Sequence, residues 1–134
     1  MLAGALLCLL AGAARAATIA EPTTGISVTV SRDGIYTIQT TDPAWTFSGT
    51  VAGGAVNIGT DSGRDAAGAF QEILFEEHGK SGRAFGIRTW AGRPGVLFSQ
   101  TVPDACANPP AFPRFSTFPV FPHNLSFAGT WAGV

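Results

Sequence analysis

Short runs in which apolar and polar residues alternate one by one are the feature that most constrains the fold of this chain. The clearest run is 26–31 (Ile-Ser-Val-Thr-Val-Ser), and 35–40 resumes the alternation after Asp33-Gly34, a dipeptide typical of tight turns. A period of two residues places successive side chains on opposite faces of a β-strand. We therefore predict an antiparallel hairpin over 26–40.

Further short strands are predicted along the chain, with turn residues between them. The segment 70–77 is ambiguous, because its residue propensities also suit a helix, but its shortness and its neighbours favour a strand. Residues 59–68, rich in Gly and Asp, are predicted to form a loop. The pattern predicts an all-β fold, an antiparallel β-sandwich, with the remaining strands at 45–51, 55–58, 85–90 and 96–102.

The first 16 residues have the form of a secretory signal peptide. Their apolar run is too short to span a bilayer, and Ala14-Arg15-Ala16 follows it as an A-x-A cleavage pattern. No Lys or Arg precedes the run, so the basic region of a typical signal is missing, and a buried apolar helix is the alternative. We expect a secreted or periplasmic protein with no membrane association after cleavage.

Cleavage at this point predicts a simple organisation for the mature chain. Residues 17–25 are expected to be a flexible leader, and 26–134 a β-sandwich domain. Cys8 is removed with the signal peptide, which leaves Cys106 as the one cysteine of the mature chain. No internal disulfide is therefore expected. No Cys/His cluster suggests a metal site, and we expect no cofactor.

Charge is sparse, and this limits the class of partner. Charged residues make up 13% of the chain, with a net charge of −1, against about 25% charged residues in a typical globular protein. Nothing is basic enough to attract a nucleic-acid backbone. The surface is therefore expected to consist mainly of neutral Thr, Ser, Gly and Asn side chains.

The segment 103–122 is rich in proline and phenylalanine. Proline cannot donate a hydrogen bond to a sheet, so this segment is not predicted to be a central strand. It is expected to extend over the sheet with its rings packed inward, namely Phe112, Phe115, Phe118 and Phe121. Residues 124–134 then begin another alternating strand that stops abruptly, which predicts a sandwich incomplete at its C-terminus.

Two groups of residues are candidates for chemistry. Glu72 and Glu76 share a strand face and could act as the paired carboxylates of a glycosidase, although a solvent-facing edge is the alternative. The tryptophans Trp45, Trp90 and Trp131 could stack on a sugar if exposed, although core packing is the alternative. No nucleophile-elbow, P-loop or zinc-protease motif occurs.

Several segments in the second half of the chain carry a resemblance to a known family. They are Asp65-Ala-Ala-Gly-Ala-Phe-Gln-Glu-Ile73, Gly86-Ile-Arg-Thr-Trp90, Pro94-Gly-Val-Leu-Phe-Ser-Gln100 and Phe112-Pro-Arg-Phe115. Their order and spacing resemble the N-terminal β-supersandwich domain of glycoside hydrolases related to α-galactosidases and raffinose synthases. The resemblance covers about half the chain and rests on spacing rather than on a diagnostic motif.

The resemblance implies an accessory role. In that family the domain precedes a catalytic barrel that carries the catalytic aspartates, so no residue of this chain inherits their role. The loop with Asp65 would approach the sugar site of that barrel. The resemblance thus favours a non-catalytic, carbohydrate-associated N-terminal domain of an exported glycoside hydrolase-like protein, with a downstream barrel as its partner. A free-standing carbohydrate-binding or adhesive sandwich, or a purely structural exported domain, are the alternatives.

Overall fold

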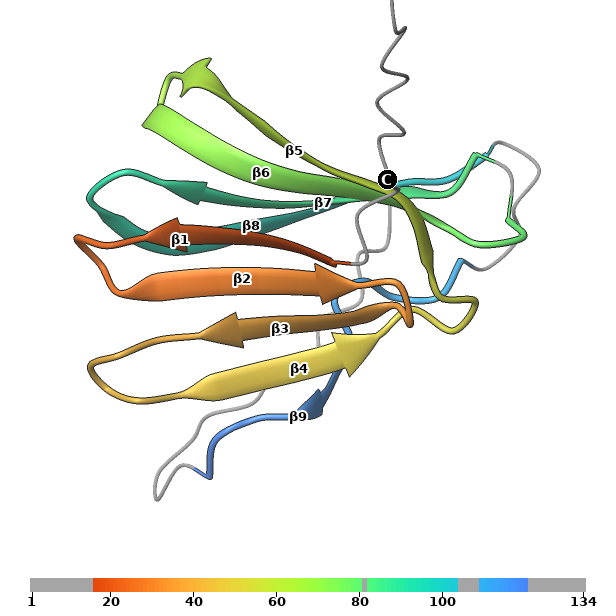
Figure 1. Cartoon of the computed structure of the whole chain (residues 1–134), viewed down its shortest axis with the longest axis horizontal. Coiled ribbons are helices and arrows are strands. Elements are labelled where there is room, and N and C mark those ends of the chain that lie inside the picture. Colours follow the sequence, from red (N-terminus) through yellow and green to blue (C-terminus); the bar gives the residue numbers. More distant parts are fainter. Residues whose placement is uncertain (1–15, 81, 104–108, 121–134) are drawn as a thin grey trace, which may run out of the picture.

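The computed structural model describes residues 16–80, 82–103 and 109–120, and these form two stacked antiparallel β-sheets (Figure 1). This confirms the predicted all-β sandwich. The five-stranded sheet has the order β1-β2-β3-β4-β9 and the four-stranded sheet the order β5-β6-β7-β8. The strands are β1 (Ala16–Glu21), β2 (Ile26–Ser31), β3 (Ile35–Gln39), β4 (Thr46–Thr50), β5 (Ala55–Asp65), β6 (Gly68–Glu77), β7 (Ala84–Trp90), β8 (Arg93–Thr101) and β9 (Phe115–Thr117).

The core lies between the sheets and follows from the alternation in the sequence. In β2 the apolar side chains at alternate positions are buried, and in β6 and β7 the same period buries the residues that face the other sheet. The largest fully buried side chains are Tyr36, Phe75, Ile73, Ile87, Val28 and Val30. Burying an aliphatic or aromatic side chain stabilises the fold by roughly 1.5–3 kcal/mol, so the alternation is the main source of stability.

The hairpin predicted over 26–40 is confirmed. β2 pairs antiparallel with β3, and Val28 lies opposite Ile38. Gly34 has φ of +79° in the connecting turn, and a Cβ there would meet the backbone oxygen of Val51 at 2.5 Å. The segment 70–77 is also a strand as predicted, because β6 spans it between β5 and β7.

The flexible leader expected at 17–25 is wrong for its first part. Residues 16–21 form β1, which pairs with β2 along its whole length. Ala17 and Ile19 are buried against the core. Alanine is a weak strand former, and Pro22 and Gly25 follow closely in the sequence. The alternation of buried and exposed residues in this strand was therefore not recognisable from the sequence.

The loop expected at 59–68 is also wrong. β5 continues to Asp65, and β6 begins at Gly68, so the two strands form a long hairpin. Most residues at 59–64 are exposed, so this part of β5 is held by backbone pairing to β6 rather than by burial. Glycine and aspartate disfavour strands in general, and the pairing outweighs that preference.

The Pro/Phe-rich segment contributes the last described strand. β9 pairs with β4 at the edge of the five-stranded sheet, as expected for a segment that cannot be a central strand. Phe112 and Phe115 pack against the core, which confirms the inward packing for these two rings. The expectation is wrong for Phe118, whose side chain is 61% exposed, and Phe121 lies outside the described residues.

Tyr36 ties this segment to the middle of the five-stranded sheet. Its hydroxyl donates to the backbone oxygen of Arg114 and accepts from the backbone N–H of the same residue, both at 2.7 Å. A Cβ on Gly49 of β4 would collide with the Tyr36 hydroxyl and the Arg114 oxygen. Only glycine at this position leaves room for the contact.

The turn between β1 and β2 is closed by a carboxylate. Glu21 accepts hydrogen bonds from the backbone N–H groups of Thr24 at 2.7 Å and Thr23 at 3.2 Å. The largest effect on the pKa of Glu21 is the lowering by the side chain of Thr24. Burial of the carboxyl acts in the opposite direction and raises the pKa. The hydrogen bonds from the backbone N–H groups of Thr24 and Thr23 lower it again, and the resulting pKa is about 2.

Replacing Glu21 with glutamine is expected to remove part of the acid sensitivity of the fold. A carboxyl with a lowered folded-state pKa contributes stability above its unfolded pKa and loses it as the pH falls through the folded value. That window runs from the ordinary glutamate pKa of 4.5 down to the folded-state pKa of about 2. Denaturant unfolding of both proteins across this range checks the expectation, and parallel pH dependence of the two would contradict it.

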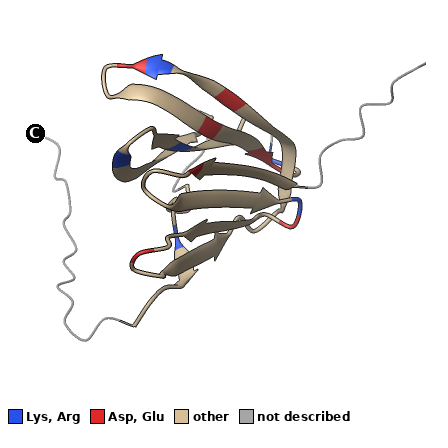
Figure 2. Ribbon diagram, turned by 60° about the vertical axis from the view of Figure 1, so that its left-hand side comes forward, with Lys and Arg blue, Asp and Glu red and all other residues tan. Residues whose placement is uncertain are grey.

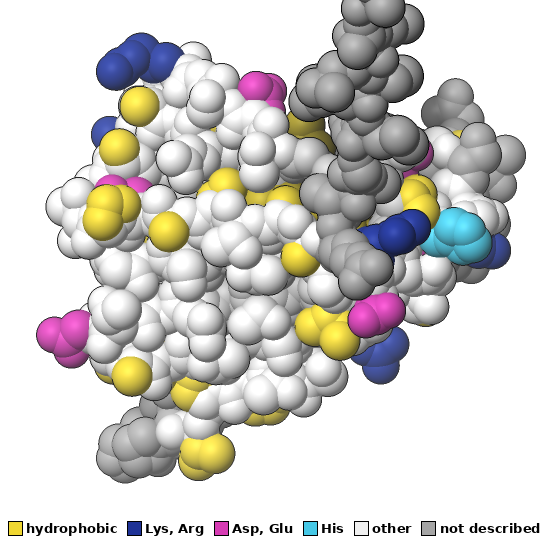
Figure 3. Space-filling model, in the orientation of Figure 1, with side chains coloured by type: hydrophobic (Ala, Val, Ile, Leu, Met, Phe, Trp, Pro, Cys, Tyr) yellow, Lys and Arg dark blue, Asp and Glu magenta, His cyan; other side chains and the backbone are white. Residues whose placement is uncertain are grey.

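Charged residues are divided unequally between the sheets (Figure 2). Glu21 is the one charged residue within the strands of the five-stranded sheet, whereas each strand of the four-stranded sheet carries at least one. The face shown in Figure 3 carries mostly neutral side chains, with the charged ones near its margins. Within the described residues no helix is long and apolar enough to cross a membrane.

Candidate functional site

The outer face of the four-stranded sheet carries a cluster of charged and aromatic side chains. Strand pairing sets it up, because Phe70 lies opposite Trp90, and Glu72 opposite Arg88, between β6 and β7. The intervening Ile73 and Ile87 point into the core. The two-residue period therefore places all four cluster side chains on the face away from the core, and Asp65 joins them from the end of β5.

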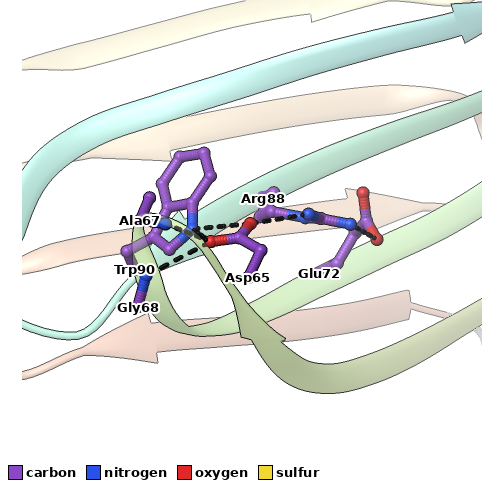
Figure 4. Close-up of polar contacts among 6 residues, drawn as sticks. All are labelled: Asp65, Ala67, Gly68, Glu72, Arg88 and Trp90. Atoms are coloured by element: carbon purple, nitrogen blue, oxygen red, sulfur yellow. Dashed lines mark hydrogen bonds and ion pairs between the residues drawn. The ribbon is translucent and has the colours of Figure 1, made fainter.

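Asp65 is the centre of the cluster (Figure 4). The indole N–H of Trp90 donates to its carboxylate, at 2.9 Å from Oδ1 and 3.0 Å from Oδ2. The backbone N–H groups of Ala67 and Gly68 donate to Oδ1 at 2.8 and 3.2 Å. One carboxylate thus closes the β5–β6 turn and fixes the plane of the Trp90 ring.

Arg88 lies between two carboxylates. Its Nη1 donates to Asp65 Oδ2 and its Nη2 to Glu72 Oε2, both at 3.0 Å. Its guanidinium also stacks on Phe70, with the Cζ 3.8 Å from the ring centroid, an arrangement that adds a cation–π attraction. The Nε of Arg88 is buried and has no hydrogen-bond partner among the described residues.

The charges in the cluster stabilise one another. Burial alone would raise the pKa of Asp65, but the hydrogen bonds from Trp90, Ala67, Arg88 and Gly68 outweigh it, and the pKa is lowered. Hydrogen bonding to Glu72 raises the pKa of Arg88 first; burial opposes this, and Asp65 adds to the rise. Asp65 and Arg88 therefore keep their charges throughout the neutral pH range.

The two glutamates considered as a catalytic pair have different surroundings. Glu72 is buried and ion-paired with Arg88. Glu76 is exposed, and its Oε2 accepts a hydrogen bond from the Asn57 side chain at 3.1 Å. They share the face of Leu74, which is 43% exposed, as the strand period predicts. Each carboxylate is thus engaged with a neighbouring strand.

Trp45 lies elsewhere, at one end of the sandwich. Its side chain is 38% exposed, and it lines a cavity of about 400 Å³ between the sheets. Of the four residues predicted to bind a ligand, the structure therefore brings Asp65 and Trp90 together and places Trp45 apart. Trp131 lies outside the described residues, as does Cys106.

Sequence reasoning missed Arg88 and Phe70 as members of the cluster. The available signal was the strand period, since Arg88 and Trp90 are two apart on β7, and Phe70 and Glu72 are two apart on β6. What the sequence did not show was the register that sets the two pairs opposite each other.

The described residues contain no group of three or more His, Cys, Asp or Glu side chains placed to hold a metal ion. No protein-family model, curated protein or solved structure matches this chain.

Proposed function

We propose that this chain is a non-catalytic, carbohydrate-associated β-sandwich domain of an exported glycoside hydrolase-like protein. The observation that carries the proposal is the contact between Trp90 and Asp65, in which the carboxylate fixes the indole beside the Arg88 guanidinium. Sugar recognition needs an apolar ring face for the C–H groups and planar polar groups for the hydroxyls.

The chemistry of the cluster suits a neutral, hydroxyl-rich ligand. Arg88 offsets one of the two negative charges of Asp65 and Glu72, so the cluster carries a single net negative charge and disfavours an anionic ligand. Charged hydrogen-bonding groups recognise hydroxyls more strongly than neutral groups do. Because the groups already hold one another in place, little side-chain freedom is lost on binding. The cluster is thus organised before a ligand arrives.

Export and a downstream catalytic barrel belong to the same proposal. The signal-like sequence at 1–16 supports a secreted or periplasmic location, and cleavage before Ala17 would leave the buried part of β1 in the mature chain. The pairing of Glu72 with Arg88 supports a binding role rather than acid–base catalysis for this chain. A free-standing carbohydrate-binding module is the second candidate, favoured because the cluster is built entirely from residues of this chain.

Replacing Trp90 with alanine is expected to weaken sugar binding at least tenfold, which corresponds to about 1.4 kcal/mol. The full chain would first be screened on an array of neutral glycans, and the best ligand titrated by calorimetry. Trp90→Phe keeps a ring but loses the bond to Asp65, so it should bind with intermediate affinity.

Trp45→Phe is the matched control, because Trp45 is remote from the cluster and should leave the affinity unchanged. Thermal unfolding of each variant would confirm that it is folded. The proposal fails if the chain binds no glycan, or if Trp90→Ala binds as tightly as the unaltered chain while remaining folded.

A further inference from the structure

The cavity at the end of the sandwich has a wall of aromatic rings. Trp45 packs edge-on against Phe47, with ring centroids 6.4 Å apart and an interplanar angle of 89°. Phe115 lies 5.6 Å from Phe47 and 5.8 Å from Phe98. All four residues line the cavity, so the rings form a continuous wall across the gap between the two sheets.

The charge at this cavity has one sign. Asp42 is the one ionisable side chain among the described residues that line it. Arg93 precedes the lining residue Pro94 but does not itself line the cavity. Thr24 and Thr40 add hydroxyls, and the remaining lining is almost wholly apolar. A ligand here would meet aromatic side chains and one carboxylate, that of Asp42, which is three residues from Trp45 in the chain.

We propose that this cavity binds an organic ammonium ion, most favourably one whose nitrogen carries methyl groups. A tryptophan face attracts a cation through its ring quadrupole, and aromatic walls of this kind hold quaternary ammonium groups because these are cationic yet weakly hydrated. The carboxylate of Asp42 supplies the complementary charge. A volume of about 400 Å³ lies within the range of small-molecule sites.

The site is separate from the cluster around Asp65 and Trp90, so it goes beyond the proposed function. If the cavity binds no ammonium ion, the proposed sugar binding at Asp65 and Trp90 is unaffected. If the cluster binds no sugar, the proposed ammonium site is equally unaffected. An anionic ligand is disfavoured by Asp42, and a neutral apolar ligand would gain nothing from it.

The test is a calorimetric titration of the full chain with choline and with 3,3-dimethyl-1-butanol, its uncharged isostere. We expect choline to bind at least about fivefold more tightly, since one cation–π contact and one exposed carboxylate each contribute modestly. Asp42→Asn should weaken choline about two- to fivefold without changing the affinity of the isostere. Asp61→Asn, an exposed carboxylate on β5, is the control and should change neither.

Trp45→Ala should abolish detectable choline binding, whereas Trp45→Phe should retain part of it. Partial binding by Trp45→Phe would show that the loss in Trp45→Ala comes from the removed ring and not from unfolding of the chain. Equal affinity for choline and its isostere would overturn the proposal in favour of a purely apolar ligand. So would the absence of choline binding by the full chain. Binding seen only in a chain shortened to end at Val120 would also overturn it, because residues 121–134 would then be the occupant.

Discussion

Replacing Phe112, whose ring is partly buried against the core, with alanine is expected to lower the free energy of unfolding by up to about 3 kcal/mol. The Phe112 ring lies 4.7 Å from the centroid of Phe85, 5.2 Å from Tyr36 and 5.7 Å from Phe98. It also lies 6.1 Å from Phe75. It therefore joins rings of both sheets, and its removal would leave a void that none of them can fill without losing another contact.

The loss would be a large part of a typical total stability of about 5–15 kcal/mol. Denaturant unfolding followed by tryptophan fluorescence measures it. Phe118→Ala is the matched control from the same segment, because the Phe118 side chain is 61% exposed and its removal should change stability by less than about 0.5 kcal/mol. Equal effects of the two substitutions would show that Phe112 does not anchor the segment.

Replacing Arg83 with methionine is expected to destabilise the fold by about 3–5 kcal/mol. Arg83 and Glu77 form an ion pair whose side chains are 10% and 5% exposed. The Arg83 guanidinium also lies 5.7 Å from the ring centroid of Phe85. Arg83 is the cation that pairs with Glu77 among the described residues, so without it the Glu77 carboxylate would remain as an uncompensated buried charge, and this charge is the main cost.

The double substitution Arg83→Met with Glu77→Leu distinguishes two contributions to stability. One is the free-energy cost of leaving the Glu77 carboxylate buried and unpaired, and the other is the net contribution of the Arg83–Glu77 ion pair. Replacing both partners with apolar residues should recover most of the lost stability, because burying either charge costs free energy that the attraction barely offsets. Arg64→Met, at an exposed position of β5, should have little effect. If Arg83→Met alone unfolds at the same denaturant concentration as the unaltered chain, Glu77 tolerates the loss.

The strand pattern of the sequence was sufficient for the fold class and for most of the strands. It succeeded where burial on one face is strong, as in 26–31, because each apolar residue there points into the core. It failed for Ala16–Glu21 and for the outer half of β5. In the outer half of β5, backbone pairing to β6 rather than burial determines the structure. In β1 the alternate residues are buried, but two of its three outward positions and one of its inward positions are alanines, so the sequence alternation is faint.

The candidate site was less accessible to sequence reasoning. Asp65 and Trp90 were singled out separately, 25 residues apart, and nothing in their local sequence shows that they touch. Their contact depends on the register of β6 against both β5 and β7. Register is a property of paired strands, so Arg88, which links the two carboxylates, emerged only with the three-dimensional structure.

The way β9 joins the five-stranded sheet has a consequence for the order of folding. Strands β1 to β4 pair as successive hairpins, and so do β5 to β8, so most pairing joins neighbouring segments. Among the strands that the structure describes, β9 alone pairs across a long stretch of sequence, with Phe115 opposite Gly49. Contacts of high sequence separation carry the largest loop-closure entropy and form slowly. We therefore expect both hairpin arrays to assemble before the aromatic segment docks, and that segment to add contacts to two sheets that already pack on each other through β1, β5 and β6.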